Sequence, residues 1–260
     1  MIFRDDALAG QHIIISGGCG GIGVGVVKAL TDHGAKMSVN DVLDETEAHK
    51  RLADAGVSRN RYAYLKGDLT QPAEVEAFVA FARTSFGPIH TALCHVGMVI
   101  AVPLLEFKAA DWDQTMNVNV KSAFLLGQAA ARAMIADGVK GQLVFTTSWV
   151  AETPWPDIGP YNTSKAAMNQ LMRSFARELA DKGVRANCIA PGIVGVGMAK
   201  RQWDTDPVYK ARASKAIPLG FMQPLDSVAN GFLFLCSPAA SYMTGSVLTM
   251  DGGCSLYPMD

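Results

Sequence analysis

Short apolar runs alternate along the chain with longer segments in which apolar residues recur every three to four positions. The short runs predict strands at 12–16, 36–42, 62–66, 91–96, 142–147, 185–190 and 246–250. The longer segments predict helices at 22–34, 46–55, 72–86, 110–138, 161–182 and 227–235. Such alternation favours parallel strands, because each crossover is right-handed and its helix must cover the sheet. The sequence therefore predicts an α/β fold, a doubly wound, seven-stranded parallel sheet with helices on both faces.

The size and composition of the chain favour one domain spanning 1–260. An α/β domain often reaches 260 residues around a single core, and 49% hydrophobic residues against 18% charged ones can build that core. The stretch 193–218 is the one long interruption of the pattern, polar and rich in Lys, Arg and Met. Because it follows the sixth predicted strand, we expect it to form a substrate lid.

Charge and cysteine usage exclude several function classes. A net charge of -1 lacks the excess of basic residues that phosphate backbones require, so no nucleic-acid partner is expected. The segment 1–10 lacks a signal-type apolar stretch and no run is long enough to span a bilayer, which predicts a cytoplasmic protein without a membrane partner. Five scattered cysteines predict neither disulfides nor a metal site: Cys19, Cys94, Cys188, Cys236 and Cys254.

A glycine-rich turn, Ser16-Gly17-Gly18-Cys19-Gly20-Gly21-Ile22-Gly23, follows the first predicted strand and opens the first helix. Its backbone N–H groups and the helix N-terminus would face one point, which is a binding site for a pyrophosphate. Glycine permits both the tight turn and close approach of the backbone to phosphate oxygens. By itself such a pattern is more often an ordinary turn, whereas the flanking strand and helix favour dinucleotide binding.

Acidic residues follow the next two predicted strands. Asp41 lies about twenty residues beyond the turn, where a carboxylate accepts both ribose hydroxyls and repels a 2′-phosphate. This spacing favours NAD over NADP, and no basic residue lies beside Asp41 in the sequence; the alternative is a solvated loop aspartate. Asp68 and Leu69 are candidates to flank the adenine, although Asp68 could instead cap the helix beginning near Pro72.

Tyr161 and Lys165 are four residues apart in a predicted helix, so their side chains share one face. A nearby ammonium would lower the pKa of the phenol toward the range of a general base, which removal of hydride from an alcohol requires. Such a pair is commonly structural when isolated. Here Ser148 ends the fifth predicted strand, and the sheet geometry would bring its hydroxyl to the same edge to hold a substrate oxygen.

Taken together, the motifs resemble the short-chain dehydrogenase/reductase family, in its form with a seven-stranded Rossmann sheet and a usual tetrameric assembly. The likeness covers nearly the whole chain. The motifs that carry it are Ser16-Gly17-x-x-x-Gly21-Ile22-Gly23, Asp68-Leu69, Asn117-Val118-Asn119-Val120, Ser148, Tyr161-x-x-x-Lys165, Asn187-x-Ile189-x-Pro191-Gly192 and Asp251-Gly252-Gly253.

The resemblance implies roles for individual residues. Tyr161 would be the acid/base, Ser148 the ligand of the substrate oxygen, Lys165 both the modulator of Tyr161 and a ribose ligand, and Asn119 the anchor of a water-linked proton path. The resemblance also implies cofactor contacts by Gly17, Gly21, Gly23, Ile22 and Val194. A homotetramer binding a small-molecule substrate is the expected assembly.

The chain departs from the family pattern in two places. It reads Cys94-His95-Val96-Gly97 where Asn-Asn-Ala-Gly is usual, and Val196 replaces a threonine after Pro191-Gly192. One interpretation is that backbone contacts at Cys94 still bind the cofactor and only packing differs. The other is that His95 faces the ribose or substrate and alters the proton path. With Val196, one cofactor hydrogen bond would be missing.

Trp149, Glu152 and Trp155 lie between the serine and the tyrosine and are candidates to bind substrate. The two tryptophans could equally pack against the lid, and Trp203 within the lid allows the same two interpretations. Glu152 could accept hydroxyl hydrogen bonds from a polyol. The sequence thus predicts an NAD-dependent oxidoreductase that interconverts a secondary alcohol and a ketone or lactone, on a sugar, polyol or similar compound. The alternatives are an NADP-linked ketoreductase, for example of acyl-thioesters, and a dinucleotide-binding sensor without turnover.

Overall fold

The computed structural model describes residues 4–256. The predicted domain 1–260 therefore extends beyond the described residues at both ends, by positions 1–3 and 257–260. Its seven strands form one parallel sheet in the order β3-β2-β1-β4-β5-β6-β7, which confirms the predicted fold. The strands are β1 (His12–Ser16), β2 (Lys36–Asp41), β3 (Tyr62–Lys66), β4 (Thr91–Cys94), β5 (Gln142–Thr146), β6 (Arg185–Pro191) and β7 (Val247–Met250).

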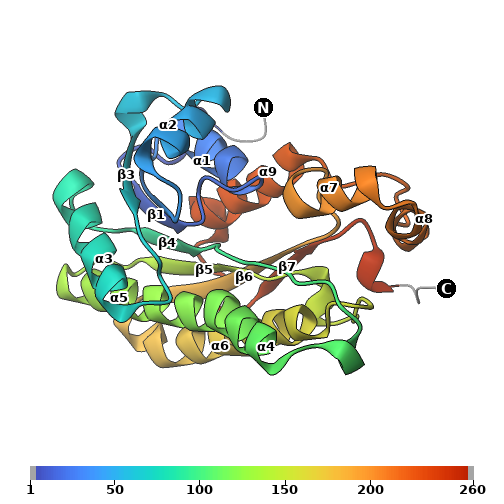
Figure 1. Cartoon of the computed structure of the whole chain (residues 1–260). Coiled ribbons are helices and arrows are strands. Elements are labelled where there is room, and N and C mark those ends of the chain that lie inside the picture. The colour runs from blue at the N-terminus through green and yellow to red at the C-terminus, as the bar shows by residue number, and fades with distance from the viewer. Residues whose placement is uncertain (1–3, 257–260) are drawn as a thin grey trace.

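Helices cover both faces of the sheet (Figure 1). One apolar core lies beneath α1 (Gly23–Asp32), α2 (Glu45–Asp54) and α9 (Leu225–Cys236). A second lies on the other face beneath α3 (Pro72–Phe86), α5 (Ser122–Ala136) and α6 (Gly159–Leu179), with α4 (Ala109–Met116) leading into α5. Strands buried on both faces read as continuous apolar runs, which is why the sequence pattern was so clear.

The interval 193–218 contains two helices, α7 (Gly197–Thr205) and α8 (Pro207–Ala216). They stand apart from the sheet, beyond the carboxyl end of β6 (Figure 1). A small third core joins them to the segment between β5 and α6 through Trp155 and Tyr209, among other residues. This segment is therefore attached to the region where Ser148 and Tyr161 lie.

Several element boundaries differ from the prediction by a few residues, and two of the differences have clear local reasons. The predicted strand 91–96 ends at Cys94, because the next two backbone N–H groups, of His95 and Val96, donate to the Ser16 hydroxyl at 3.0 and 3.2 Å. The predicted helix 110–138 is interrupted by a π-helical turn, Asn117–Lys121, around the buried side chain of Asn119. Within residues 4–256, no helix combines the length and apolarity needed to cross a membrane.

Candidate active site

The glycine turn joins β1 to α1, and several of its glycines have no room for a side chain. A Cβ on Gly23 would lie 2.4 Å from the Gly17 carbonyl oxygen, and Gly17 itself has φ +69. A Cβ on Gly21 would lie 2.9 Å from the Cα of Gly197, at the start of α7. The turn is thus a bare backbone concavity at the N-terminus of α1, with Ile22 at the N-cap position, and it fits a dinucleotide pyrophosphate.

Gly18 is a further steric requirement that the sequence analysis missed. A Cβ there would lie 2.6 Å from Cγ1 of Val39 and 2.9 Å from Cγ2 of Ile15. These side chains belong to β2 and β1, so Gly18 allows the turn to pack directly on the sheet. The signal was present in the sequence, but only the strand pairing shows which glycine meets which neighbour.

Asp41 ends β2 and is half-buried against the glycine turn. Its Oδ2 accepts a hydrogen bond from the Cys19 backbone N–H at 3.1 Å, and its Oδ1 accepts one from Val42 N–H at 2.8 Å. Burial, followed by the charge of Asp41, raises the pKa of the Cys19 thiol to about 12. Asp41 is therefore anchored beside the turn and is not a solvated loop residue, which suits a ribose ligand.

Asp68 and Leu69 follow β3 at the same edge of the sheet. The Asp68 carboxylate accepts from Thr70 N–H at 3.0 Å, while its own N–H donates to Oε2 of Glu74. The N-cap of α3 is Gln71, so the alternative in which Asp68 caps this helix is wrong. Leu69 is buried in the core under α3, which leaves its backbone for any adenine contact.

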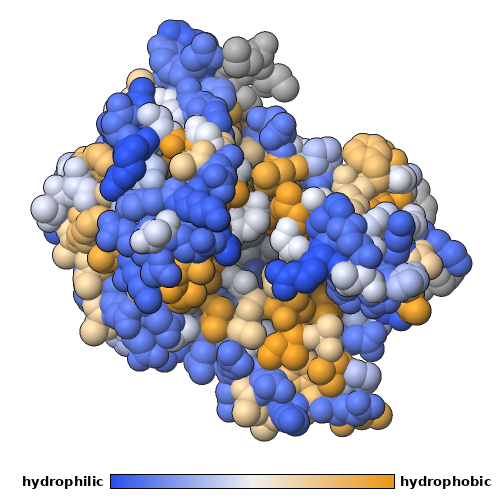
Figure 2. Space-filling view, turned by 45° about the horizontal axis from the view of Figure 1, so that its top comes forward, coloured by the Kyte–Doolittle hydropathy of each residue, from blue (hydrophilic) through white to orange (hydrophobic). Residues whose placement is uncertain are grey.

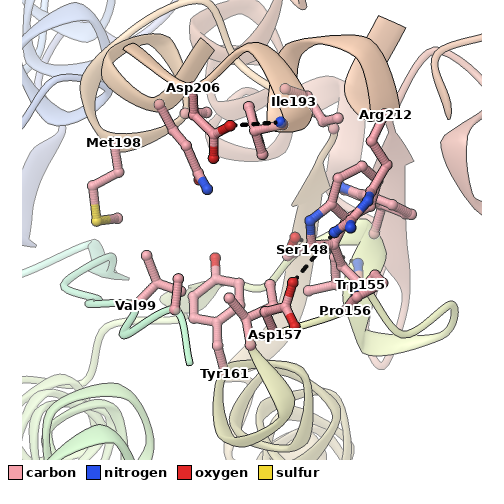
Figure 3. Close-up of a pocket in the computed structure, with 18 of the residues that line it drawn as sticks. Val99, Ser148, Trp155, Pro156, Asp157, Tyr161, Ile193, Met198, Asp206 and Arg212 are labelled. Atoms are coloured by element: carbon pink, nitrogen blue, oxygen red, sulfur yellow. Dashed lines mark hydrogen bonds and ion pairs between the residues drawn. The ribbon is translucent and has the colours of Figure 1, made fainter. Parts of the chain in front are cut away.

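Ser148 and Tyr161 face one cavity from two different elements. Ser148 lies just after β5, and its Oγ accepts from Val150 N–H at 3.4 Å. Tyr161 lies in the first turn of α6, and its hydroxyl points into the cavity (Figure 3). Burial of the phenol raises the pKa of Tyr161 to about 12, and a hydrogen bond with Ser148 opposes part of that rise. The predicted pair of hydroxyls is thus brought together.

Lys165 is 2% exposed and lies below the tyrosine ring. Its Nζ donates to the Thr146 carbonyl oxygen at 2.8 Å and stands 5.4 Å from the Tyr161 ring centroid. Burial lowers the pKa of Lys165 to about 8. In the chain alone the pKa of Tyr161 is therefore raised and not lowered as expected, because the cost of burying a phenolate dominates.

Asn119 connects three segments. Its Oδ1 accepts from Met98 N–H at 2.8 Å, and its Nδ2 donates to Met98 O at 3.0 Å and to Ser164 Oγ at 2.9 Å. These bonds tie the loop after β4 to the π turn and to α6, one residue from Lys165. The geometry gives Asn119 a positioning role, whereas the implied water-linked proton path stays a prediction.

Of the unusual Cys94-His95 pair, Cys94 is buried in the core and His95 is partly buried. The Cys94 Sγ contacts the Ala123 carbonyl oxygen at 3.5 Å within the core, so only its backbone is available to a cofactor. His95 Nδ1 lies 2.9 Å from Thr146 Oγ1, and its ring meets Phe232 edge-on at 5.8 Å. Burial, followed by the charge of Lys165, lowers the pKa of His95 to about 4. His95 therefore supports Thr146 as a neutral ring.

The loop after β6 is held by a side chain that the sequence analysis did not select. Gln223 Oε1 accepts from Gly192 N–H at 2.9 Å, and its backbone N–H donates to Ile193 O at 2.8 Å. Val194, the predicted carboxamide contact, is buried and bridges to Gln223. Val196 packs against the core under α1. Nothing in the sequence marked Gln223, because the backbone atoms of Gly192 and Ile193 that it holds lie about thirty residues away.

A cavity of about 200 Å³ opens above Ser148 and Tyr161. Figure 2 shows the molecule hollowed between the α7–α8 segment and the glycine-turn half, with hydrophobic residues below the opening. Trp149 and Trp155 line the cavity and meet edge-on at 5.5 Å, and Trp155 meets Tyr209 of α8 at 5.9 Å. Each tryptophan therefore packs in the small third core and also lines the cavity, whereas contact of either one with a substrate stays a prediction.

Glu152 and Trp203 lie outside the lining of this cavity. Glu152 is exposed, so the structure gives no support to its predicted contact with a substrate hydroxyl. Trp203 is partly buried and lies under Lys210, whose Nζ is 5.8 Å from its ring centroid. In the described part of the chain, no three His, Cys, Asp or Glu side chains gather in a way that would hold a metal ion.

Comparison with known proteins agrees with this geometry. A family profile described as Enoyl-(Acyl carrier protein) reductase matches residues 17–255. Short-chain dehydrogenase reductase 3a of Arabidopsis thaliana is 33% identical, covering 96% of this chain and 96% of that protein. The 2,5-dichloro-2,5-cyclohexadiene-1,4-diol dehydrogenase of Sphingobium indicum is 33% identical over 95% of this chain and 97% of its own.

A solved short-chain type dehydrogenase/reductase from Mycobacterium marinum superposes with a TM-score of 0.85 at 30% identity, covering 96% of this chain and 97% of that one. The chain belongs to the short-chain dehydrogenase/reductase family. It is therefore an oxidoreductase whose family membership implies a nicotinamide dinucleotide cofactor and a small-molecule substrate.

Proposed function

We propose that this enzyme interconverts a secondary alcohol and a ketone or lactone by hydride transfer with NAD. The observation that carries the proposal is the meeting of the Ser148 and Tyr161 hydroxyls in one cavity, at the edge of the sheet that also holds the glycine turn. Ligands of open α/β sheets bind at this edge, where the chain reverses its winding direction.

The residues divide the chemistry between them. Ser148 holds the substrate oxygen, and Tyr161 Oη takes the hydroxyl proton as the alcohol is oxidised or returns it as the ketone is reduced. When bound, the nicotinamide ring supplies the hydride acceptor and, in its oxidised form, a positive charge. Lys165, fixed by Thr146, keeps a second positive charge beneath the phenol. The apolar walls exclude water from the reacting carbon.

A raised Tyr161 pKa has a direct consequence for this scheme. With a pKa of about 12, the phenol of the chain alone stays protonated near neutrality. The base form then requires positive charge next to the ring beyond what Lys165 provides, and this would couple deprotonation of Tyr161 to the binding of oxidised cofactor.

The preference for NAD rests on Asp41, whose anchored carboxylate would repel a 2′-phosphate. One spatial observation favours NADP instead. Arg51 of α2 is not adjacent to Asp41 in sequence, yet its guanidinium reaches the Cys19 carbonyl oxygen at 3.5 Å. Glu47 accepts from Arg51 Nε at 2.7 Å and offsets that charge. We therefore keep NAD as the proposal and expect it to bind more tightly than NADP.

For the substrate, the cavity favours a compact cyclic alcohol over a sugar or polyol. The polyol hypothesis depended on Glu152 and on polar groups of the lid. Glu152 lies outside the lining, and although Gln202, Asp206 and Arg212 of the lid do line the cavity, apolar side chains form most of its wall. A relative named for a cyclohexadiene diol supports a ring-shaped substrate. The interval 193–218, which carries much of the wall, would act as the lid.

The expectations of a homotetramer and a cytoplasmic location are retained as proposals. Apolar side chains that are more than a third exposed on α4 and α5, namely Trp112, Phe124 and Ile135, give support for self-association. Light scattering of the purified protein would measure the assembly.

The experiment that tests the function combines the protein with NAD or NADP and a panel of cyclic and linear secondary alcohols, following reduced cofactor by absorbance. Replacing Tyr161 by Phe should lower kcat by about 10²- to 10⁴-fold, because the proton acceptor is lost. Tyr242→Phe, at a fully exposed tyrosine, is the matched control and should leave kcat unchanged. A protein that binds NAD yet turns over nothing on a broad panel would be a sensor.

A further inference from the structure

Arg212 and Asp157 form a partly exposed ion pair at one side of the cavity. Arg212 projects from α8, Asp157 lies in the segment before α6, and both line the cavity. The guanidinium Nη1 is 3.4 Å from Asp157 Oδ2 and the guanidinium carbon is 5.8 Å from the Trp155 ring centroid. In Figure 3 this contact closes the side of the cavity opposite Met198 and Val99.

The backbone at Asp157 is held in an unfavourable conformation that presents its carboxylate to α8. It has φ +66 and is the one non-glycine residue with positive φ between residues 4 and 256. Its carbonyl oxygen accepts from Val102 N–H at 2.7 Å, which fixes the peptide from the opposite side. Such strain persists only where neighbouring structure imposes it, and aspartate tolerates it better than most residues.

The bridge is weak enough to open in each catalytic cycle. The two side chains are 35% and 47% exposed, and a solvated ion pair of this kind contributes little to stability. The contact of the guanidinium with Trp155 adds a weak cation–π attraction. Packing of Tyr209 on Trp155 attaches α8 more firmly than the ion pair does. The ion pair can therefore break while α8 stays packed.

We propose that the Arg212–Asp157 bridge is a gate that sets the size limit of the substrate. The closed pair forms the outer wall of the cavity, so a compact ring fits beneath it and a longer substituent does not. The size limit rests on the proposed function, whereas the opening of the lid does not.

The charges around the cavity agree with an uncharged substrate. Among the described residues that line it, Asp157 and Asp206 carry negative charge and Arg212 carries positive charge. Asp206 accepts the first N–H groups of α8, from Val208 and Tyr209, so its carboxylate is committed to capping. An anionic group on the substrate would have to displace Asp157 from Arg212 despite this excess of negative charge.

Hydrogen exchange of the free protein tests the gate without any substrate. Arg212→Met and Asp157→Asn should each raise amide exchange in 197–216 by about threefold, as expected for the loss of a pair of this strength. Lys210→Met is the matched control, since Lys210 lies on the same helix with Nζ 5.8 Å from the Trp203 ring but does not line the cavity. Unchanged exchange in the first two variants, or an equal rise in the control, would overturn the gate.

A specificity measurement tests the size limit. We compare kcat/KM for cyclohexanol and 4-tert-butylcyclohexanol, and Arg212→Met should raise the bulky-to-small ratio about fivefold, a change of about 1 kcal/mol. Lys210→Met should not change that ratio. An unchanged kcat/KM ratio together with increased amide exchange would overturn the size limit. If the wild type turned over neither alcohol, that result would count against the proposed function. The exchange measurement would still decide whether the gate exists.

Discussion

The cofactor-facing half of the site is shaped by the backbone, whereas the substrate-facing half is shaped by side chains. In the glycine turn the constraint is the backbone itself, because side chains at Gly18 and Gly23 would overlap neighbouring atoms. In the cavity the constraint comes from side chains, with Trp149, Trp155 and Tyr209 forming a wall. The backbone turn suits the constant pyrophosphate of a dinucleotide, whereas substitution of side chains in the cavity can change its substrate specificity.

Tyr161 and Lys165 lie where these halves meet, and their energetics differ from both. Each is a polar group in protein surroundings that disfavour its charged form. The cofactor half provides affinity for the cofactor through its backbone geometry, and the substrate half selects the shape of the substrate. At Tyr161 and Lys165, by contrast, burial perturbs the pKa values of groups that take part in the reaction. Three predictions separate these contributions.

The largest effect is expected from Gly23→Ala in the cofactor half. The new Cβ would lie 2.4 Å from the Gly17 carbonyl oxygen, so the turn must shift and NAD affinity should fall by about 100-fold or more, that is by about 2.7 kcal/mol. Gly20→Ala in the same turn is the control, because its Cβ would approach no closer than 3.4 Å. Titration of NADH fluorescence measures both, and equal affinities would show that the turn is not a rigid cradle.

A smaller effect, on stability, is expected from Lys165→Met, which should stabilise the fold. Burial lowers the pKa of Lys165 from 10.5 to about 8, so the protonated amine destabilises the native state at pH 7. After allowing for the lost bond to Thr146, the variant should gain about 2 kcal/mol, or about 4 to 8 °C in Tm.

The pH dependence of the Lys165→Met gain has a definite sign. Between pH 8 and 10.5 the unfolded chain binds the Lys165 proton while the native chain releases it, so wild-type stability rises with pH in that window. The advantage of Lys165→Met should therefore shrink from pH 7 to pH 10 in calorimetry. A variant less stable than wild type at pH 7 would contradict the buried-charge interpretation.

The smallest effect is expected from Glu152→Gln in the substrate half. Glu152 is exposed and outside the cavity lining, so kcat/KM for cyclic alcohols should change by less than about twofold, as for other surface substitutions. A loss of tenfold or more would show that this loop closes over the substrate and would revive the polyol hypothesis.

Much of the site could be predicted because it lies in local pattern. Strand, glycine turn and helix are contiguous at Gly17 to Gly23, and the four-residue spacing of Tyr161 and Lys165 on a helix places both on one face. Asp41 followed from its place at a strand end. These features need no knowledge of distant contacts, because secondary structure fixes them.

Other features depended on contacts between distant segments. Gln223 acts on the backbone of the loop after β6, Arg51 approaches Cys19, and Glu152 turns outward although it lies between Ser148 and Tyr161 in the sequence. The raised Tyr161 pKa likewise reflects burial by many segments. No spacing rule within one segment carries this information.

The sequence by itself determined the sheet, the bare turn and the catalytic pair, because hydrophobic period and residue spacing act over a few residues and dictate local geometry. Only the tertiary structure decided which side chains enclose the cavity and how much stability is lost by burying charged groups beside it. It also decided that Arg212 meets Asp157 at the side of the cavity. These outcomes depend on how far-separated segments pack, and packing sums many weak contacts that no single stretch of sequence contains.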